Sequence, residues 1–190
     1  MSSSHPVSLR VNDRRARADV EARTTLADLL RDDLGYTSVH LGCEQGVCGA
    51  CTVLLDGAPV RSCLVFGVQA DGADVVTLEG LAPPGGLHPL QEAFRDSHGF
   101  QCGFCTPGFV LSAYALLAEE PAPSDATIRA ALAGHLCRCT GYQSIVEGVA
   151  LAAARLAGRP LPAPGTAGRS GGSGESGESG ESGESGGSGR

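Results

Sequence analysis

The sequence predicts an α+β protein in which a strand-rich N-terminal half precedes a helical C-terminal half. Three observations support this prediction. Short runs of alternating apolar and polar residues occur before residue 80, apolar residues at helical spacing occur after residue 89, and a Pro/Gly-rich stretch lies between them. We therefore expect one domain at 1–80, a linker at 81–88 and a second domain at 89–162.

The first half is expected to contain four or five short strands and one helix. Asp56-Gly57 is a hairpin turn signal between two apolar runs. Thr25 and Asp28 form a capping-box pattern before leucines at helical spacing, which predicts a helix over 25–34 closed by Gly35. The expected strands cover residues 7–11, 17–22, 52–56, 60–65 and 74–78.

The second half is expected to form a compact four-helix unit. Pro89 and Pro107 stand where a first helical residue is expected, and Ser124 or Asp125 is suited to cap a helix. Gly134 and Gly158 are suited to end one. The expected helices cover residues 89–98, 106–119, 124–134 and 143–157.

Charge and hydropathy exclude several classes of function. The 14 basic residues are all arginine and the net charge is −7, so no basic stripe is available for nucleic acid. No apolar run is long enough for a transmembrane segment. The N-terminus lacks the basic and apolar segments of a secretory signal, so we expect a cytoplasmic protein. Residues 163–190 are rich in Gly, Ser and Glu and are expected to be a disordered tail.

Eight cysteines fall into two groups of four, and the first group has a specific spacing. Cys43, Cys48 and Cys51 are separated by four and two residues, and Cys63 follows. This is the plant-type [2Fe–2S] pattern, whereas zinc ligands usually come as paired C-x2-4-C knuckles. Glycines beside the cysteines would let backbone amides face the cluster sulfurs. We therefore favour iron–sulfur over zinc at this site.

The second group consists of Cys102, Cys105, Cys137 and Cys139, at the boundaries of predicted helices. Taken alone, this spacing is compatible with an iron–sulfur cluster, with zinc, or with structural thiols. The histidines are not needed as ligands, because the cysteines already make two complete sets. Two redox sites close together indicate an electron relay, and no nucleophile–base pair or phosphate-binding loop accompanies them.

Three blocks of sequence resemble the iron–sulfur subunit of molybdenum hydroxylases, the xanthine oxidase family. They are Gly42-Cys-Glu-Gln-Gly-Val-Cys-Gly-Ala-Cys51, Gln101-Cys-Gly-Phe-Cys-Thr-Pro-Gly108 and Leu136-Cys-Arg-Cys-Thr-Gly-Tyr142. The resemblance covers about residues 6–160. It implies a β-grasp, plant-type [2Fe–2S] ferredoxin domain followed by an all-α four-helix domain that binds a second [2Fe–2S] cluster.

The resemblance also implies partners and a function. A large subunit would carry molybdenum on molybdopterin, often as its cytosine dinucleotide, and a medium subunit would carry FAD, in a heterotrimer or a dimer of heterotrimers. Electrons would pass to the cluster held by Cys102, Cys105, Cys137 and Cys139, and then to the cluster held by Cys43, Cys48, Cys51 and Cys63. Gln101 would contact the pterin, and Cys139 would lie close to it.

Two other functions remain as alternatives. An autonomous ferredoxin-like carrier would have a wholly polar, acidic surface, whereas a subunit of a complex would expose an apolar patch on its helical half. A zinc-stabilised interaction module would be colourless. The substrate of the complex, whether an aldehyde, a nitrogen heterocycle, a purine or carbon monoxide, is not encoded in this chain.

Overall fold

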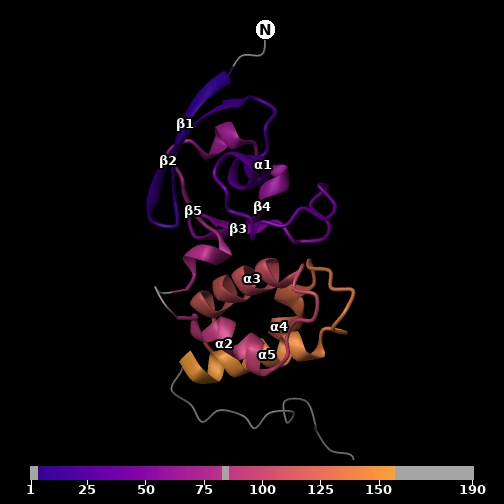
Figure 1. The fold of residues 1–190 in the computed structure, drawn as a ribbon. Helices are drawn as coiled ribbons and strands as arrows, with labels where there is room; N and C mark the ends of the chain where they lie inside the picture. Colours follow the sequence, from indigo (N-terminus) through magenta and orange to yellow (C-terminus); the bar gives the residue numbers. More distant parts are fainter. Residues whose placement is uncertain (1–3, 83–85, 157–190) are drawn as a thin grey trace, which may run out of the picture.

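The structure is a computed structural model that describes residues 4–82 and 86–156. Figure 1 shows a strand-containing half stacked on a helical half, and the overall class is α+β, as predicted. No helix within the described ranges is long and apolar enough to cross a membrane. The predicted disordered tail, 163–190, lies outside the described residues.

The N-terminal half is a mixed five-stranded sheet with the strand order β2-β1-β5-β3-β4. Strands β1 and β2 are antiparallel, β5 runs parallel to β1, and β3 pairs antiparallel with both β5 and β4. The strands are β1 (Ser4–Val11), β2 (Arg14–Glu21), β3 (Thr52–Leu55), β4 (Ala58–Arg61) and β5 (Asp74–Val76).

One helical segment packs on this sheet and closes the first core. Helix α1 (Leu26–Asp28) continues into a π-helical turn, Leu29–Asp33. Thr25 caps the helix, because the Asp28 amide donates to Thr25 Oγ1 at 3.1 Å. The Asp28 carboxylate accepts from the Thr25 hydroxyl at 2.6 Å, whereas a full capping box would have it accept from the Thr25 backbone amide. The leucines at helical spacing are buried against sheet residues such as Val11, Val53 and Val75.

The C-terminal half is built from α2 (Pro89–Asp96), α3 (Thr106–Glu119), α4 (Asp125–Leu132) and α5 (Gln143–Leu156). These helices enclose a second apolar core around Phe94, Phe109 and Ile145, each at most 1 % exposed. The two cores do not share a residue. Contact between the halves is made mainly by α3, which lies against β3 (Figure 1).

The structure corrects two local predictions. Residues 60–65 were expected to be one strand, but β4 ends at Arg61 and Cys63 lies on a 3-10 turn, Ser62–Leu64. This turn bends the chain so that Cys63 points back toward the cysteine loop instead of along the sheet. Pro107 was expected to be a first helical residue, but α3 begins one residue earlier, at Thr106, whose buried Oγ1 has no hydrogen-bond partner in the structure.

Candidate metal centres

The first group of cysteines lies on a loop that precedes β3 and on the turn that follows β4. Thr52 pairs with Arg61 across the β3–β4 hairpin, which brings the neighbouring Cys51 and Cys63 close together. Gly46 and Gly49 adopt φ of +75° and +77°, which allow the loop to fold back on itself. Both thiols at the hairpin are buried.

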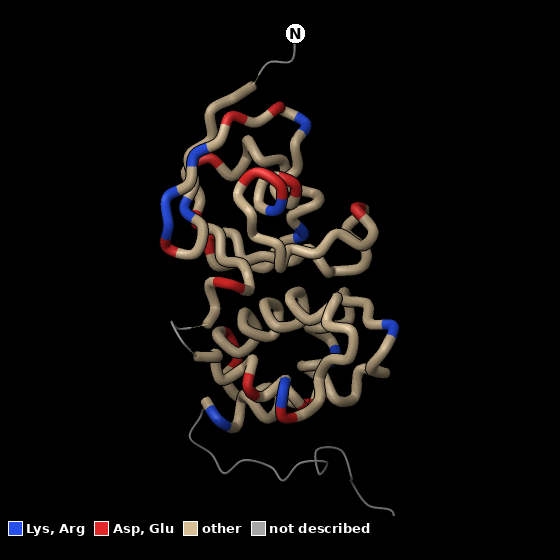
Figure 2. The backbone as a smooth tube through the Cα atoms, viewed as in Figure 1, with Lys and Arg blue, Asp and Glu red and all other residues tan. Residues whose placement is uncertain are grey.

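Backbone amides of this loop face a cysteine sulfur. The amides of Gln45 and Cys48 donate to Cys43 Sγ at 3.4 and 3.3 Å. These hydrogen bonds lower the pKa of the Cys43 thiol to about 7, which favours the thiolate form that binds iron. The residues around the loop carry few charges, and Figure 2 shows most charged positions elsewhere in the molecule.

The second group of cysteines lies at two helix boundaries. Cys102 and Cys105 immediately precede α3, whereas Cys137 and Cys139 lie between α4 and α5. Thr140 donates to Cys137 Sγ from its amide and its hydroxyl, at 3.4 and 3.1 Å. These contacts lower the pKa of the Cys137 thiol against the opposing effect of burial.

Within each group the sulfurs are arranged as two pairs. Cys139 Sγ lies 3.6 Å from Cys102 Sγ. The other adjacent thiols are Cys48 beside Cys43, Cys51 beside Cys63, and Cys137 beside Cys105. A [2Fe–2S] cluster needs two protein ligands on each of two irons, so this arrangement fits the cluster.

A mononuclear zinc site would differ in its requirement, because tetrahedral zinc takes four donors around one point. Over residues 4–82 and 86–156, no group of three or more His, Cys, Asp or Glu side chains is found that could hold a single metal ion.

One thiol of each more deeply placed pair has a raised pKa. Burial, with a smaller effect from Cys51, raises the pKa of the Cys63 thiol to about 11. Burial, followed by the effect of Cys137, raises the pKa of the Cys105 thiol to about 12. Cluster formation at these positions has to displace a proton, because the thiolate is the ligand.

The two cysteine groups are joined directly through the backbone. The amide of Leu136, next to Cys137, donates to the carbonyl oxygen of Cys48 at 2.9 Å. Gly49 and Gly108 also pass so closely that a Cβ on Gly108 would lie 2.2 Å from the Gly49 carbonyl oxygen. A third contact stacks His40 on Phe104, with ring centroids 4.7 Å apart.

A network of polar side chains lies where the two cysteine groups meet, a region that we call the seam. Its members are Thr52, Arg61, Ser112 and His135, and the sequence did not predict it. Arg61 donates to the Gly134 carbonyl at 2.8 Å and to Thr52 Oγ1 at 2.6 Å. His135 Nε2 lies 2.9 Å from Ser112 Oγ and 3.2 Å from Thr52 Oγ1. Burial and the adjacent Arg61 charge lower the pKa of His135 to about 4, so the imidazole is neutral at pH 7.

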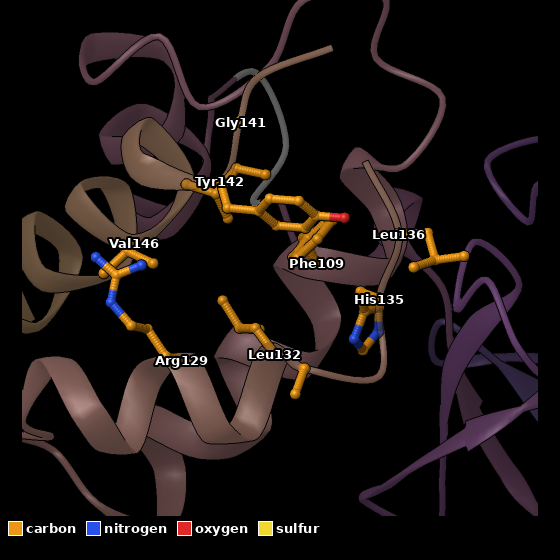
Figure 3. Close-up of a pocket in the computed structure, with 10 residues that line it drawn as sticks. Phe109, Arg129, Leu132, His135, Leu136, Gly141, Tyr142 and Val146 are labelled. Atoms are coloured by element: carbon orange, nitrogen blue, oxygen red, sulfur yellow. The ribbon is translucent and has the colours of Figure 1, made fainter. Parts of the chain in front are cut away.

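A pocket of about 380 Å³ opens beside the second cysteine group, between α3, α4 and α5 (Figure 3). Its walls are mainly apolar. Tyr142 covers one side, and its hydroxyl accepts a hydrogen bond from the Cys137 amide at 3.0 Å. The polar side chains of the lining are Arg129, His135 and Tyr142. The full lining is Phe109, Arg129, Leu132, Ala133, His135, Leu136, Gly141, Tyr142, Ile145 and Val146.

The residues expected near a pterin lie on the surface. Gln101, Cys102 and Cys139 are all exposed, at the outer side of the second cysteine group. Exposed apolar side chains on the same half include Phe100, Phe104, Leu136 and Tyr142. Large apolar side chains are thus exposed on the helical half, as expected for a subunit of a complex.

Comparison with known proteins agrees with this geometry. Residues 9–76 match the 2Fe-2S iron-sulfur cluster binding domain, and residues 77–150 match the [2Fe-2S] binding domain. The chain is 55% identical over 143 residues to the nicotine 6-hydroxylase small subunit of Paenarthrobacter nicotinovorans, covering 75% of this chain and 86% of that protein. The chain belongs to the molybdenum hydroxylase family, as an iron–sulfur subunit.

Further relatives match this iron–sulfur subunit over nearly their whole length. The gamma subunit of caffeine dehydrogenase from Pseudomonas sp. (strain CBB1) is 52% identical over 150 residues, which are 77% of this chain and 90% of that subunit. A solved chain of quinoline 2-oxidoreductase from Pseudomonas putida 86 is 46% identical and superposes with a TM-score of 0.78, covering 84% of this chain and 100% of that chain. The iron–sulfur subunit is therefore an electron-transfer component of an oxidoreductase and is not catalytic alone.

Proposed function

We propose that this subunit carries two [2Fe–2S] clusters and relays electrons from a molybdenum centre on a large subunit to a flavin subunit. The domain at 1–80, of β-grasp ferredoxin type, would hold one cluster, and the four-helix domain at 89–162 would hold the other. Each cluster supplies one-electron redox chemistry when it is bound. The ligands would be Cys43, Cys48, Cys51 and Cys63 for the first cluster and Cys102, Cys105, Cys137 and Cys139 for the second.

The observation that carries this proposal is the paired arrangement of the thiols. Each group offers two donors to each of two irons, and the Cys48–Leu136 hydrogen bond joins the two groups directly. A relay needs neighbouring redox sites because the electron-transfer rate falls steeply with distance. The fold supplies this proximity.

The exposed face of the second group supports docking to a large subunit that binds molybdopterin, often as its cytosine dinucleotide. Gln101 would contact the pterin and Cys139 would lie close to it, and both residues are exposed. The apolar side chains around them would be covered in the complex. With an FAD-binding medium subunit, the assembly would be a heterotrimer or a dimer of heterotrimers in the cytoplasm.

The relatives narrow the class of substrate. Their names refer to nicotine, caffeine and quinoline, each of which contains a nitrogen heterocycle. Aldehyde oxidoreductases match the chain as well, at 48% identity. We therefore propose a nitrogen heterocycle or an aldehyde as the substrate of the complex, and dye-coupled turnover assays on the purified complex that compare the two classes would decide between them.

Metal analysis and electron paramagnetic resonance (EPR) test the two-cluster assignment. Anaerobically purified protein is expected to contain about four irons per chain, two for each [2Fe–2S] cluster. After reduction with dithionite, it is expected to show two distinct [2Fe–2S] signals. Zinc in place of iron, or a single signal at full iron occupancy, would contradict the assignment.

A further inference from the structure

The seam between the two cysteine groups contains more polar contacts than the backbone hydrogen bond alone. Arg61 reaches across from the end of β4 and bridges Gly134 on one side and Thr52 on the other. Thr52 Oγ1 in turn donates to the Gly49 carbonyl at 2.7 Å. A guanidinium presents several donors in a rigid fork, so one side chain fixes both segments at once.

The network is built on the segments that bear the cysteines. Thr52 directly follows Cys51, Arg61 stands two residues before Cys63, and His135 stands two residues before Cys137. If any of these side chains moves, the cysteine one or two residues away therefore moves with it, and its sulfur changes position.

Apolar packing alone does not carry the directional contacts at this place. The two cores have no buried residue in common, although Leu78 packs against the core of the helical half and α3 lies against β3. The directional hydrogen bonds of the seam act together with this packing, and they select one arrangement of the halves more sharply than apolar contact does.

We propose that Arg61, Thr52 and His135 are positioning residues that fix the separation of the two cysteine groups, and thereby the rate of electron transfer between them. Their role rests on the proposed function, in which each group holds a [2Fe–2S] cluster. They touch neither substrate nor a reacting atom, and they act through the loops that they join.

EPR of the fully reduced full-length chain measures this separation, because the magnetic dipolar coupling between two reduced clusters falls with the cube of their distance. We expect Arg61→Ala to keep both signals and full iron content but to lose or narrow the splitting that arises from coupling. Arg61→Lys retains the positive charge but lacks the forked donors of the guanidinium, so we expect this variant to keep only part of the splitting. Arg23→Ala is the matched control, because Arg23 is exposed and pairs with Glu21 far from the seam.

Hydrogen exchange followed by mass spectrometry gives a second readout. Exchange of the peptide that contains the Leu136 amide is expected to accelerate about ten- to hundredfold in Arg61→Ala, as for a lost hydrogen bond to a charged group. An unchanged splitting together with unchanged exchange would overturn the positioning role.

A second variant covers the case in which Arg61→Ala fails to load iron. EPR and hydrogen exchange are then measured on Ser112→Ala, which removes the hydroxyl of α3 that contacts His135. Absence of two signals from the unmodified chain would instead refute the proposed function itself.

Discussion

Gly49→Ala is expected to destabilise the cluster-loaded protein by roughly 2–5 kcal/mol. An alanine held at positive φ costs about 1–2 kcal/mol, and overpacking at a close contact adds about 1–3 kcal/mol. The close contact is specific, because a Cβ on Gly49 would lie 2.5 Å from His135 Cδ2 and 2.9 Å from the Gly134 carbonyl oxygen. Anaerobic unfolding followed by circular dichroism, together with iron content, measures the effect.

Gly72 provides a closely matched control for this prediction. Its φ is +78°, against +77° for Gly49, and a Cβ there would meet nothing within 4 Å. Gly72→Ala is therefore expected to show only the cost of positive φ, about 1–2 kcal/mol, and to keep its iron. Equal destabilisation by the two substitutions would show that the close approach of the halves at Gly49 does not contribute to stability.

Cys105→Ser is expected to abolish one of the two [2Fe–2S] signals and to halve the iron content. Cys105 is paired with Cys137, so its loss leaves one iron with a single thiolate ligand. In the native complex, substrate is still expected to reduce the molybdenum centre, while electron delivery to the flavin falls to the background rate. Stopped-flow spectra of the flavin, recorded after mixing with substrate, measure that delivery.

Cys43→Ser is the reciprocal variant for this experiment. It is expected to remove the other signal and leave the one that Cys105→Ser removes. Normal turnover with an acceptor that draws electrons from the flavin, in a Cys105→Ser complex that lacks the second cluster, would refute the proposed electron path.

Most secondary-structure elements could be predicted because their signals are local. The Asp56-Gly57 turn lies between β3 and β4 as expected, and Thr25 caps α1 by accepting from the Asp28 amide. The Cys63 segment was predicted wrongly because its apolar alternation resembles a strand. Its 3-10 turn depends on contacts with the distant cysteine loop, which no local pattern encodes.

The sequence also could not predict the seam network. Arg61 and His135 are 74 positions apart, and their pairing depends on how the two halves pack. The only available signal was that each stands two residues before a cysteine. The histidines were not expected to be needed as ligands, and His135 is a buried structural residue that contacts Ser112 through Nε2.

The two cysteine groups differ in their exposure, and this difference has a consequence for handling the protein in air. Cys51 and Cys63 are buried, whereas Cys102 and Cys139 are exposed. Thiolates at the surface are the first to be oxidised to sulfenic acid and beyond. A chain separated from its large subunit should therefore bleach in two stages, with the centre in the helical half decaying first and the centre beneath the β3–β4 hairpin surviving longer.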